Sequence, residues 1–492
     1  MKQLTIIQTF LSRFLILVLN FGLVIFSTNI WGSEGKGIIS ILVADLAIIG
    51  FFANIFVGSS VTYFSSKYKT EQILLYAYSW SVIVGFAIPV IFSFTQHSAQ
   101  NLNYLIVLSV IFSLLNSNIN LFVGKQNINK FNVYTILQQA LHLFFIVVLL
   151  YFFKKTEVST YFVAQIFCYL VLFIFSSFEL LKNINISNIS FSKNIVKSLF
   201  NYGWKTQLSA FVQFLNYRLS YYFLEYFKGI ASVGVFSVGV AFSEAIWMVS
   251  RSLSVILYSD VVNSKNHQDS IEKTKISLRI SFLITLVSLI AILIIPAQVY
   301  VFIFGKEFNH TKQIILLLSP GILAIAVSNI IGHYFAGVNQ LLILNIKSII
   351  GLVFTIISSF YFIPKWGILG ACIVTTISYF LSSAILFWKF YQITTFRVSD
   401  FILSKSEINL LLQKFSVKNS TLYFPSMDHS PSTQDYLYAH YTNKHILSLA
   451  CSLHIYNPQV EHYRPHSDCP PLQEVPHQKI LSLSMNFFLI MK

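Results

Sequence analysis

Charged side chains are scarce in this chain of 492 residues, since Asp, Glu, Lys and Arg together make up only 10% of it. Soluble domains usually contain about 25% of these residues. Hydrophobic residues reach 55% and the mean hydropathy is +0.68, so the composition excludes a soluble globular enzyme. A bilayer-spanning helix needs about 20 mainly apolar residues, and runs of that length recur along the chain. We expect an all-α polytopic membrane protein.

Cysteines and catalytic motifs are also scarce. The four cysteines are too few and too scattered to indicate a disulfide scaffold. The sequence has no GxxxxGK[ST] P-loop, no HExxH zinc motif and no GxSxG nucleophile motif, which argues against an ATP-driven pump and a hydrolase. We expect no enzyme activity, no catalytic residues, no cofactor and no metal.

Basic residues exceed acidic ones and give a net charge of +15. They stand singly between apolar runs, which is typical of the positive-inside rule and does not indicate nucleic-acid binding. The connections between successive spans lie alternately on the two sides of the membrane. The connections of one side hold eighteen Lys and Arg, among them Lys347, and those of the other side hold seven, among them Lys36. This count predicts that both ends of the helical region are cytoplasmic. About twelve transmembrane helices are expected, at residues 10–30, 39–62, 72–95, 102–123, 132–153, 160–181, 206–225, 231–258, 276–298, 312–335, 341–363 and 368–390.

Two internal similarities divide these spans into equivalent halves. The start of the second span resembles that of the eighth at an offset of 197 residues, with Gly37 matching Gly234. The fourth and fifth spans resemble the tenth and eleventh at an offset of 213, with Gly124 matching Gly337. Six spans per half give a parallel repeat, as in alternating-access transporters. We expect two six-helix lobes around a central cavity. The N-terminal lobe spans residues 1–183, the C-terminal lobe spans residues 206–395, and residues 184–205 form a cytoplasmic linker between them.

The remaining residues, 396–492, form an expected cytoplasmic tail whose composition changes abruptly at about Lys414. The last 79 residues hold seven of the twelve His, seven of the eleven Pro and no Gly. We expect disorder beyond about residue 414, and a shifted reading frame is one hypothesis for the change. Five residues of the tail have spacings near those of zinc ligands: Cys451, His454, His462, His466 and Cys469. A His-rich tail produces such spacings by accident, which is the simpler explanation.

Four ionisable residues fall inside the expected spans: Asp45, Arg218, Glu244 and Arg251. Such groups are costly in a bilayer and normally face the bundle interior or a water-filled cavity. A guanidinium offers a fork of donors that matches phosphate oxygens, so Arg218 and Arg251 point to a phosphate-bearing substrate. Alternatively, Glu244 pairs with an arginine of a neighbouring helix as a structural contact, and Asp45 stays wet near an interface. Two histidines are more simply explained as packed side chains than as proton relays: His142 and His333.

Several segments together resemble one family. The glycine-rich residues 31–40 resemble the loop between the first two helices of polysaccharide-biosynthesis flippases, the O-antigen translocases of the multidrug/oligosaccharidyl-lipid/polysaccharide exporter superfamily. Four further segments resemble this family's second-half signature and its C-terminal end: residues 202–204, 216–220, 234–237 and 396–415. The resemblance covers about residues 1–415. Ser220 departs from the pattern, because family members often have an acidic residue there.

The resemblance implies a flippase that moves an isoprenoid diphosphate-linked oligosaccharide, an O-antigen or capsule repeat unit, across a bacterial inner membrane by alternating access. The implied partners are this lipid-linked substrate, membrane lipids, a polysaccharide polymerase and a chain-length regulator. We expect substrate binding by Arg218, Arg251, Glu244 and Asp45, with Arg13 at the cytoplasmic entrance.

Two alternatives stay open. One is a multidrug or small-molecule exporter of the same superfamily, whose cavity for organic cations would favour carboxylates and aromatic rings. The other is a polytopic polysaccharide polymerase, which would need a long charged exterior loop, whereas the longest one expected here spans only about residues 299–311.

Overall fold

The computed structural model describes residues 3–94, 101–182, 192–264, 266–394 and 396. All of them belong to one compact unit of the chain. The expected tail beyond residue 396, with its cysteines and histidines, and residues 184–191 of the expected linker lie outside the described residues.

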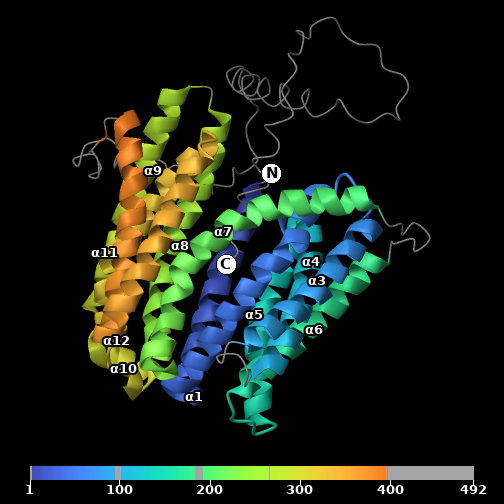
Figure 1. Ribbon diagram of the computed structural model, residues 1–492, viewed down its shortest axis with the longest axis horizontal. Helices are drawn as coiled ribbons and strands as arrows, with labels where there is room; N and C mark the ends of the chain where they lie inside the picture. Colours follow the sequence, from blue (N-terminus) through green and yellow to red (C-terminus); the bar gives the residue numbers. More distant parts are fainter. Residues whose placement is uncertain (1–2, 95–100, 183–191, 265, 395, 397–492) are drawn as a thin grey trace, which may run out of the picture. The chain divides into compact units, whose positions relative to one another are not determined.

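The described residues form helices without strands, which confirms the all-α fold (Figure 1). What we call the first lobe comprises α1 (Gln3–Val57), α2 (Ser59–Phe64), α3 (Thr70–Ser93), α4 (Leu102–Gly124), α5 (Ile128–Tyr151) and α6 (Ser159–Leu181). The second lobe comprises α7 (Lys193–Lys228), α8 (Ile230–Asn263), α9 (His267–Ile294), α10 (Ala297–Phe304), the short 3-10 helix η3 (Lys306–Phe308), α11 (Thr311–Gly337) and α12 (Leu341–Thr394).

Nine of the helices in the described part of the chain are long and apolar enough to cross a membrane. Two of them, α1 and α12, are kinked at Gly32 and Gly367, where φ is 63° and 57°, so each can form two spans. Helix α7 is not among the nine, because polar residues such as Gln213, Asn216 and Arg218 lower its mean hydropathy. If each kinked helix is counted as two spans and α7 is added once, the total agrees with the predicted number of about twelve.

The two ends of the bundle need names. The kink of α1 lies at the lower end of the view in Figure 1, and we call this the Gly32 end. The opposite end, where α5 and α7 begin, we call the Lys130 end.

Backbone conformation repeats between the lobes at the offsets seen in the sequence. Three pairs of residues share a positive φ: Gly32 with Gly229 at an offset of 197, and Gln126 with Asn339 and Lys154 with Gly367 at an offset of 213. The turns after α4 and α11 also match, because the amides of Asn127 and Gln340 donate to the carbonyls of Phe122 and Phe335, each at 2.8 Å. These turns support the equivalence of the halves, while the lobe boundaries stay a prediction.

The lobes meet closely where α1 crosses α8 at the Gly32 end. A Cβ added to Gly234 would lie 1.9 Å from the carbonyl oxygen of Ser33, and one added to Gly37 would lie 2.0 Å from that of Ile230. Ser33 and Ile230 are themselves 197 residues apart, so the contact is reciprocal under the internal repeat. Glycine lets the two backbones approach this closely because it has no Cβ.

The connection between α9 and α11 covers the kink of α1 at the same end. The Glu307 carboxylate accepts a hydrogen bond from the Ser33 amide at 2.5 Å. The Asn29 side-chain amide donates to the carbonyl of Ile303 at 2.6 Å. These two bonds, which we call the Glu307 latch, therefore join the second lobe to both sides of Gly32.

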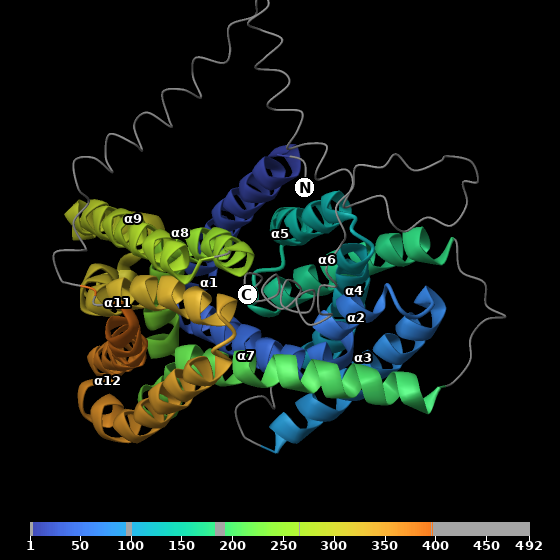
Figure 2. The ribbon, with the colours of Figure 1, turned by 90° about the horizontal axis from the view of Figure 1, so that it is seen from above.

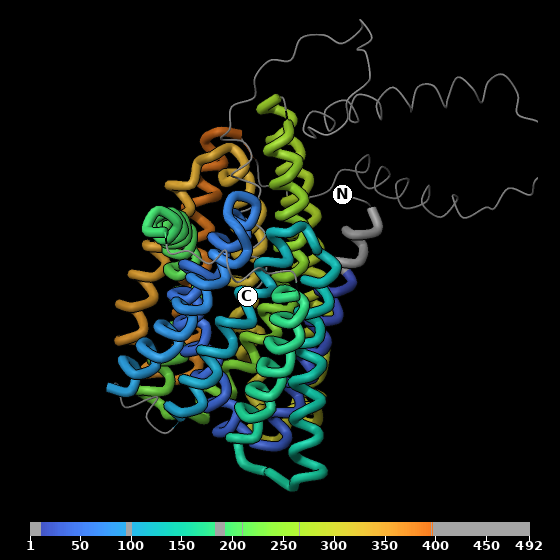
Figure 3. The backbone as a smooth tube through the Cα atoms, turned by 90° about the vertical axis from the view of Figure 1, so that its right-hand side faces the viewer, coloured from blue at the N-terminus to red at the C-terminus, as the bar shows by residue number. Residues whose placement is uncertain are grey.

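The first part of α7 runs across the Lys130 end of the first lobe. Figure 2 shows it crossing the ends of the other helices, and in Figure 3 it is seen almost end-on while they run lengthwise. Ile195 and Leu199 are buried in the hydrophobic cluster of the first lobe, and Tyr202 stacks on Tyr63 with ring centroids 4.7 Å apart. Residues 193–208, which we call the α7 arm, thus extend the predicted linker as a helix packed on the first lobe.

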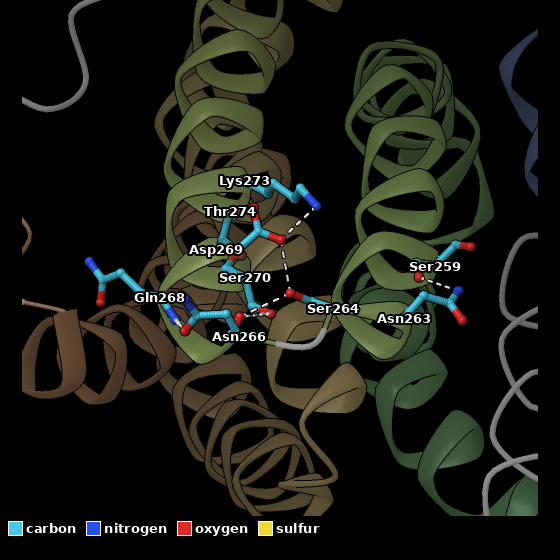
Figure 4. Close-up of polar contacts among 9 residues, drawn as sticks. All are labelled: Ser259, Asn263, Ser264, Asn266, Gln268, Asp269, Ser270, Lys273 and Thr274. Atoms are coloured by element: carbon cyan, nitrogen blue, oxygen red, sulfur yellow. Dashed lines mark hydrogen bonds and ion pairs between the residues drawn. The ribbon is translucent and has the colours of Figure 1, made fainter. Parts of the chain in front are cut away.

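The turn between α8 and α9 is capped by polar side chains (Figure 4). The Asn266 side chain begins α9 by accepting a hydrogen bond from the Gln268 amide at 3.0 Å. Asp269 accepts from the Ser264 hydroxyl at 2.9 Å and pairs with Lys273 at 2.7 Å. Capping supplies partners for amides that have none within the helix, so this turn is fixed locally.

Candidate substrate site in the second lobe

The centre of the candidate site is an ion pair between α7 and α8. Nη2 of Arg218 lies 2.6 Å from Oε1 of Glu244, and Nη1 of Arg218 donates to the Tyr221 hydroxyl at 2.5 Å. The two charged side chains are 22% and 37% exposed. A guanidinium held by two partners keeps a fixed orientation, because its donors form a planar fork. The predicted structural pairing of Glu244 is therefore present, and it also orients Arg218.

Arg251 lies two turns from Glu244 on α8. Its guanidinium is 5.6 Å from the centroid of the Trp247 ring, and it hydrogen-bonds to the hydroxyl of Tyr217. The Tyr217 ring packs against those of Trp247 and Tyr379, with centroids 5.3 and 5.4 Å away. An aromatic wall of the second lobe thus positions this second guanidinium.

Two lysines that the charge count assigned to the membrane surface lie beside these arginines. Lys36 of α1 is only 9% exposed and interacts electrostatically with Arg218 and Glu244. Lys347 of α12 donates to the Ser328 hydroxyl at 3.2 Å and interacts electrostatically with Arg251. Lys36 therefore adds a cation near Arg218, and Lys347 adds one near Arg251, so that α1, α7, α8 and α12 each contribute a cationic group.

Asp45 links the two lobes through a separate contact. It is 5% exposed and accepts a hydrogen bond from the Tyr222 hydroxyl of α7 at 2.8 Å. Glu225 also interacts electrostatically with Tyr222. Burial at this level does not fit the alternative in which Asp45 stays wet, and the carboxylate instead joins α1 to α7.

Arg13 and His142 lie in the first lobe away from this cluster, whereas His333 interacts electrostatically with Lys347 and Arg251. The Arg13 guanidinium of α1 lies 5.5 Å from the centroid of the Phe131 ring of α5, within the first lobe. His142 Nε2 is 3.1 Å from the carbonyl oxygen of Tyr161. His333 Nδ1 is 2.8 Å from the carbonyl oxygen of Asn329. Both rings are therefore packed and hydrogen-bonded.

Ser220 lies beside a cluster of uncharged side chains that hydrogen-bond to one another. Ser220 Oγ is 3.2 Å from Thr375 Oγ1. One turn away on α7, the side-chain oxygen Oδ1 of Asn216 accepts from the hydroxyls of Thr355 at 2.9 Å and Ser378 at 2.8 Å. Two hydroxyl donors thus occupy the Asn216 side-chain oxygen without a carboxylate, while the Asn216 side-chain nitrogen has no hydrogen-bond partner within the described residues.

The first lobe contains a small pocket of about 220 Å³ at the Lys130 end, which Lys125, Lys130 and Glu179 help to line. Lys130 and Glu179 pair at 2.8 Å, and burial lowers the pKa of Lys125. Paired opposite charges make this pocket a weaker anion site than the Arg218 cluster. Within the described residues, no group of three or more His, Cys, Asp or Glu could hold a metal ion.

Comparison with known proteins supports the predicted resemblance, although no family model matches the chain. One relative, named a probable low-salt glycan biosynthesis flippase of Haloferax volcanii, is 22% identical over 192 residues, covering 38% of this chain and 41% of that protein. The capsular polysaccharide biosynthesis protein CapF of Staphylococcus aureus is 28% identical over 173 residues, covering 34% of this chain and 43% of that protein. The chain thus matches about two-fifths of the length of each.

Solved structures show the fold. The lipid II flippase MurJ in an inward closed conformation has a TM-score of 0.66 and 14% identity, covering 92% of this chain and 98% of that one. An inward-facing multidrug resistance MATE family transporter of the MOP superfamily has a TM-score of 0.62 and 15% identity, covering 77% and 94%. The chain therefore has the polytopic fold of these transporters and is a multi-pass membrane protein.

Proposed function

We propose that this protein is a flippase that moves an isoprenoid diphosphate-linked oligosaccharide across a bacterial inner membrane by alternating access. One observation carries the proposal: two pairs of cations, Lys36 with Arg218 and Lys347 with Arg251, lie on four helices of both lobes. Cations held at membrane depth match the diphosphate that links the lipid to the sugar. The relatives named for glycan and capsule biosynthesis support the same substrate class.

The orientation follows from the distribution of basic residues. Lys67, Lys125, Lys130 and the lysines of the α7 arm lie at the Lys130 end, which we therefore place in the cytoplasm. The Gly32 end then faces the exterior, where the reciprocal glycine contact and the Glu307 latch hold the lobes together. The substrate would bind from the cytoplasmic side between the lobes, with its lipid tail in the bilayer. Polymerization of the exported units would require the polymerase and chain-length regulator as separate partners.

An exporter of organic cations fits less well. Such a substrate would have to approach four cationic side chains, and like charges repel strongly where the dielectric is low. The aromatic wall of Tyr217, Trp247 and Tyr379 is compatible with stacking against sugar rings instead.

Substitution of Arg218 tests the proposal in a host that lacks its own copy of the gene. Arg218→Ala should abolish surface polysaccharide and accumulate lipid-linked repeat units on the cytoplasmic leaflet, because the diphosphate loses its oriented fork of donors. Lys365→Ala, which removes an exposed cation outside the cluster, is the matched control and should leave polysaccharide unchanged. Normal polysaccharide in the Arg218 variant at normal membrane abundance would refute the assignment.

A further inference from the structure

The α7 arm carries an outward face that the flippase mechanism leaves unused. The arm is fixed on its inner side, because a Cβ on Gly203 would lie 1.8 Å from the carbonyl oxygen of Ile55, and Thr206 hydrogen-bonds to Ser59 at 2.7 Å. These contacts hold the inner side of the arm against the first lobe, so the opposite side faces outward.

Large apolar side chains form one stripe on this outer side. Phe200, Trp204 and Leu208 follow one another at intervals of four residues and are 41%, 43% and 46% exposed. The rings of Phe200 and Trp204 are parallel within 6°, with centroids 6.4 Å apart. Exposed aromatic residues on a helix that crosses the bundle end are typical of the membrane–water interface.

Basic residues lie on the same outer side. At 3.6 residues per turn, Lys193 and Lys197 fall within the arc of the apolar residues and Lys205 lies about 60° to one side of it, and all three are exposed. Within the described residues, no carboxylate lies within ion-pair distance of these lysines. Aromatic and lysine side chains that share one outward face match the membrane–water interface, where apolar chains meet negatively charged headgroups.

We propose that the α7 arm binds the headgroups of anionic phospholipids in the leaflet at the Lys130 end. The aromatic stripe enters the interface, and the three lysines contact lipid phosphates. Each lysine near a charged bilayer surface contributes about 1 kcal/mol, which corresponds to about a fivefold preference for the anionic lipid. Because Arg218 lies on the same helix, the headgroups would also hold the start of the helix that carries the substrate site.

Trp204 is a natural probe for this binding. The full-length protein is reconstituted in phosphatidylcholine nanodiscs with increasing fractions of brominated phosphatidylglycerol or brominated phosphatidylcholine. The Trp204 signal is the difference between the wild type and Trp204→Phe. Brominated phosphatidylglycerol should quench this signal with an apparent association at least about fivefold stronger than brominated phosphatidylcholine. Salt at about 0.5 M shortens the electrostatic screening length to about 4 Å and should weaken this preference.

Two triple variants separate the arm from general electrostatics. Lys193→Gln with Lys197→Gln and Lys205→Gln should bring the preference close to one, and the single Lys197→Gln should reduce it partly. Lys154→Gln with Lys155→Gln and Lys306→Gln removes as many exposed charges at the Gly32 end and should keep it. Equal quenching by both lipids would overturn the proposal. So would the absence of quenching by either, which would make an acidic protein the occupant. The readout needs no transport, so it is independent of the proposed substrate.

Discussion

The reciprocal glycine contact predicts that a single methyl group will change the balance between conformations. In Gly234→Ala the new carbon would lie 1.9 Å from the backbone oxygen of Ser33, so the contact must open. Overpacking of this kind costs about 1–3 kcal/mol. The cost applies only to conformations in which α1 touches α8 at the Gly32 end. The population closed at this end should therefore fall about 5- to 150-fold relative to an open one.

Distances between the lobes report this shift. Spin labels at Lys155→Cys in the first lobe and Asn309→Cys in the second, both exposed, can be measured by double electron–electron resonance in nanodiscs after the native cysteines are replaced by serine. Gly234→Ala should add or enlarge a population with a longer distance. Gly37→Ala should act alike, because its Cβ would lie 2.0 Å from the equivalent backbone oxygen of Ile230.

Gly332→Ala in α11 is the matched control. Its added Cβ would lie 3.6 Å from the nearest side-chain atom, which is an ordinary contact distance. It gains the same intrinsic helix propensity of about 1 kcal/mol without touching the lobe contact. Unchanged distances in Gly234→Ala, with a melting temperature like that of the wild type, would mean that the contact does not hold this end closed.

Three further predictions concern single contacts. Glu307→Gln replaces a charged acceptor of the Ser33 amide by a neutral one at an exposed site. The population with the longer distance between the same spin labels should therefore increase, by less than about tenfold. An unchanged population would show that the Glu307 latch is dispensable. Tyr222→Phe removes a donor from the buried Asp45 carboxylate and should lower stability by about 1–3 kcal/mol in thermal unfolding, whereas Tyr226→Phe, at a residue 71% exposed, should not. Asn266→Ala removes the cap of α9 and should cost about 1 kcal/mol; a cost as large in Asn263→Ala would contradict the capping role.

The sequence was informative about which residues break the apolar pattern. Arg218, Glu244 and Arg251 stood out because few charged residues interrupt the spans. Their pairing was a matter of tertiary structure, since Arg218 and Glu244 are separated by a turn at Gly229 and could have faced any neighbouring helix. The bond between Asp45 and Tyr222 joins residues 177 positions apart, which no local pattern could predict.

Lys36 and Lys347 show why the charge count misplaced part of the site. A basic residue near the end of an apolar run is normally a surface residue, and long side chains usually extend to water. Here α1 resumes its helix immediately after Gly32, so Lys36 falls one turn inside the structure and is buried against α7 and α8. The kink at Gly32 contacts Glu307 of a distant segment, and residues 31–40 alone do not predict that contact.

The two repeat offsets differ by 16 residues, 213 against 197, and this difference has a mechanical consequence. The additional residues of the second lobe fall between the start of α9 and the end of α11, the interval that contains α10 and η3. A fully symmetric repeat would place an equivalent segment over Gly229, yet a Cβ added there would meet nothing within 4 Å, whereas one on Gly32 would meet Glu307 at 2.9 Å. The reciprocal glycine contact between α1 and α8 therefore follows the internal repeat. The Glu307 latch departs from the repeat, because it joins the lobes at Gly32 and has no equivalent at Gly229.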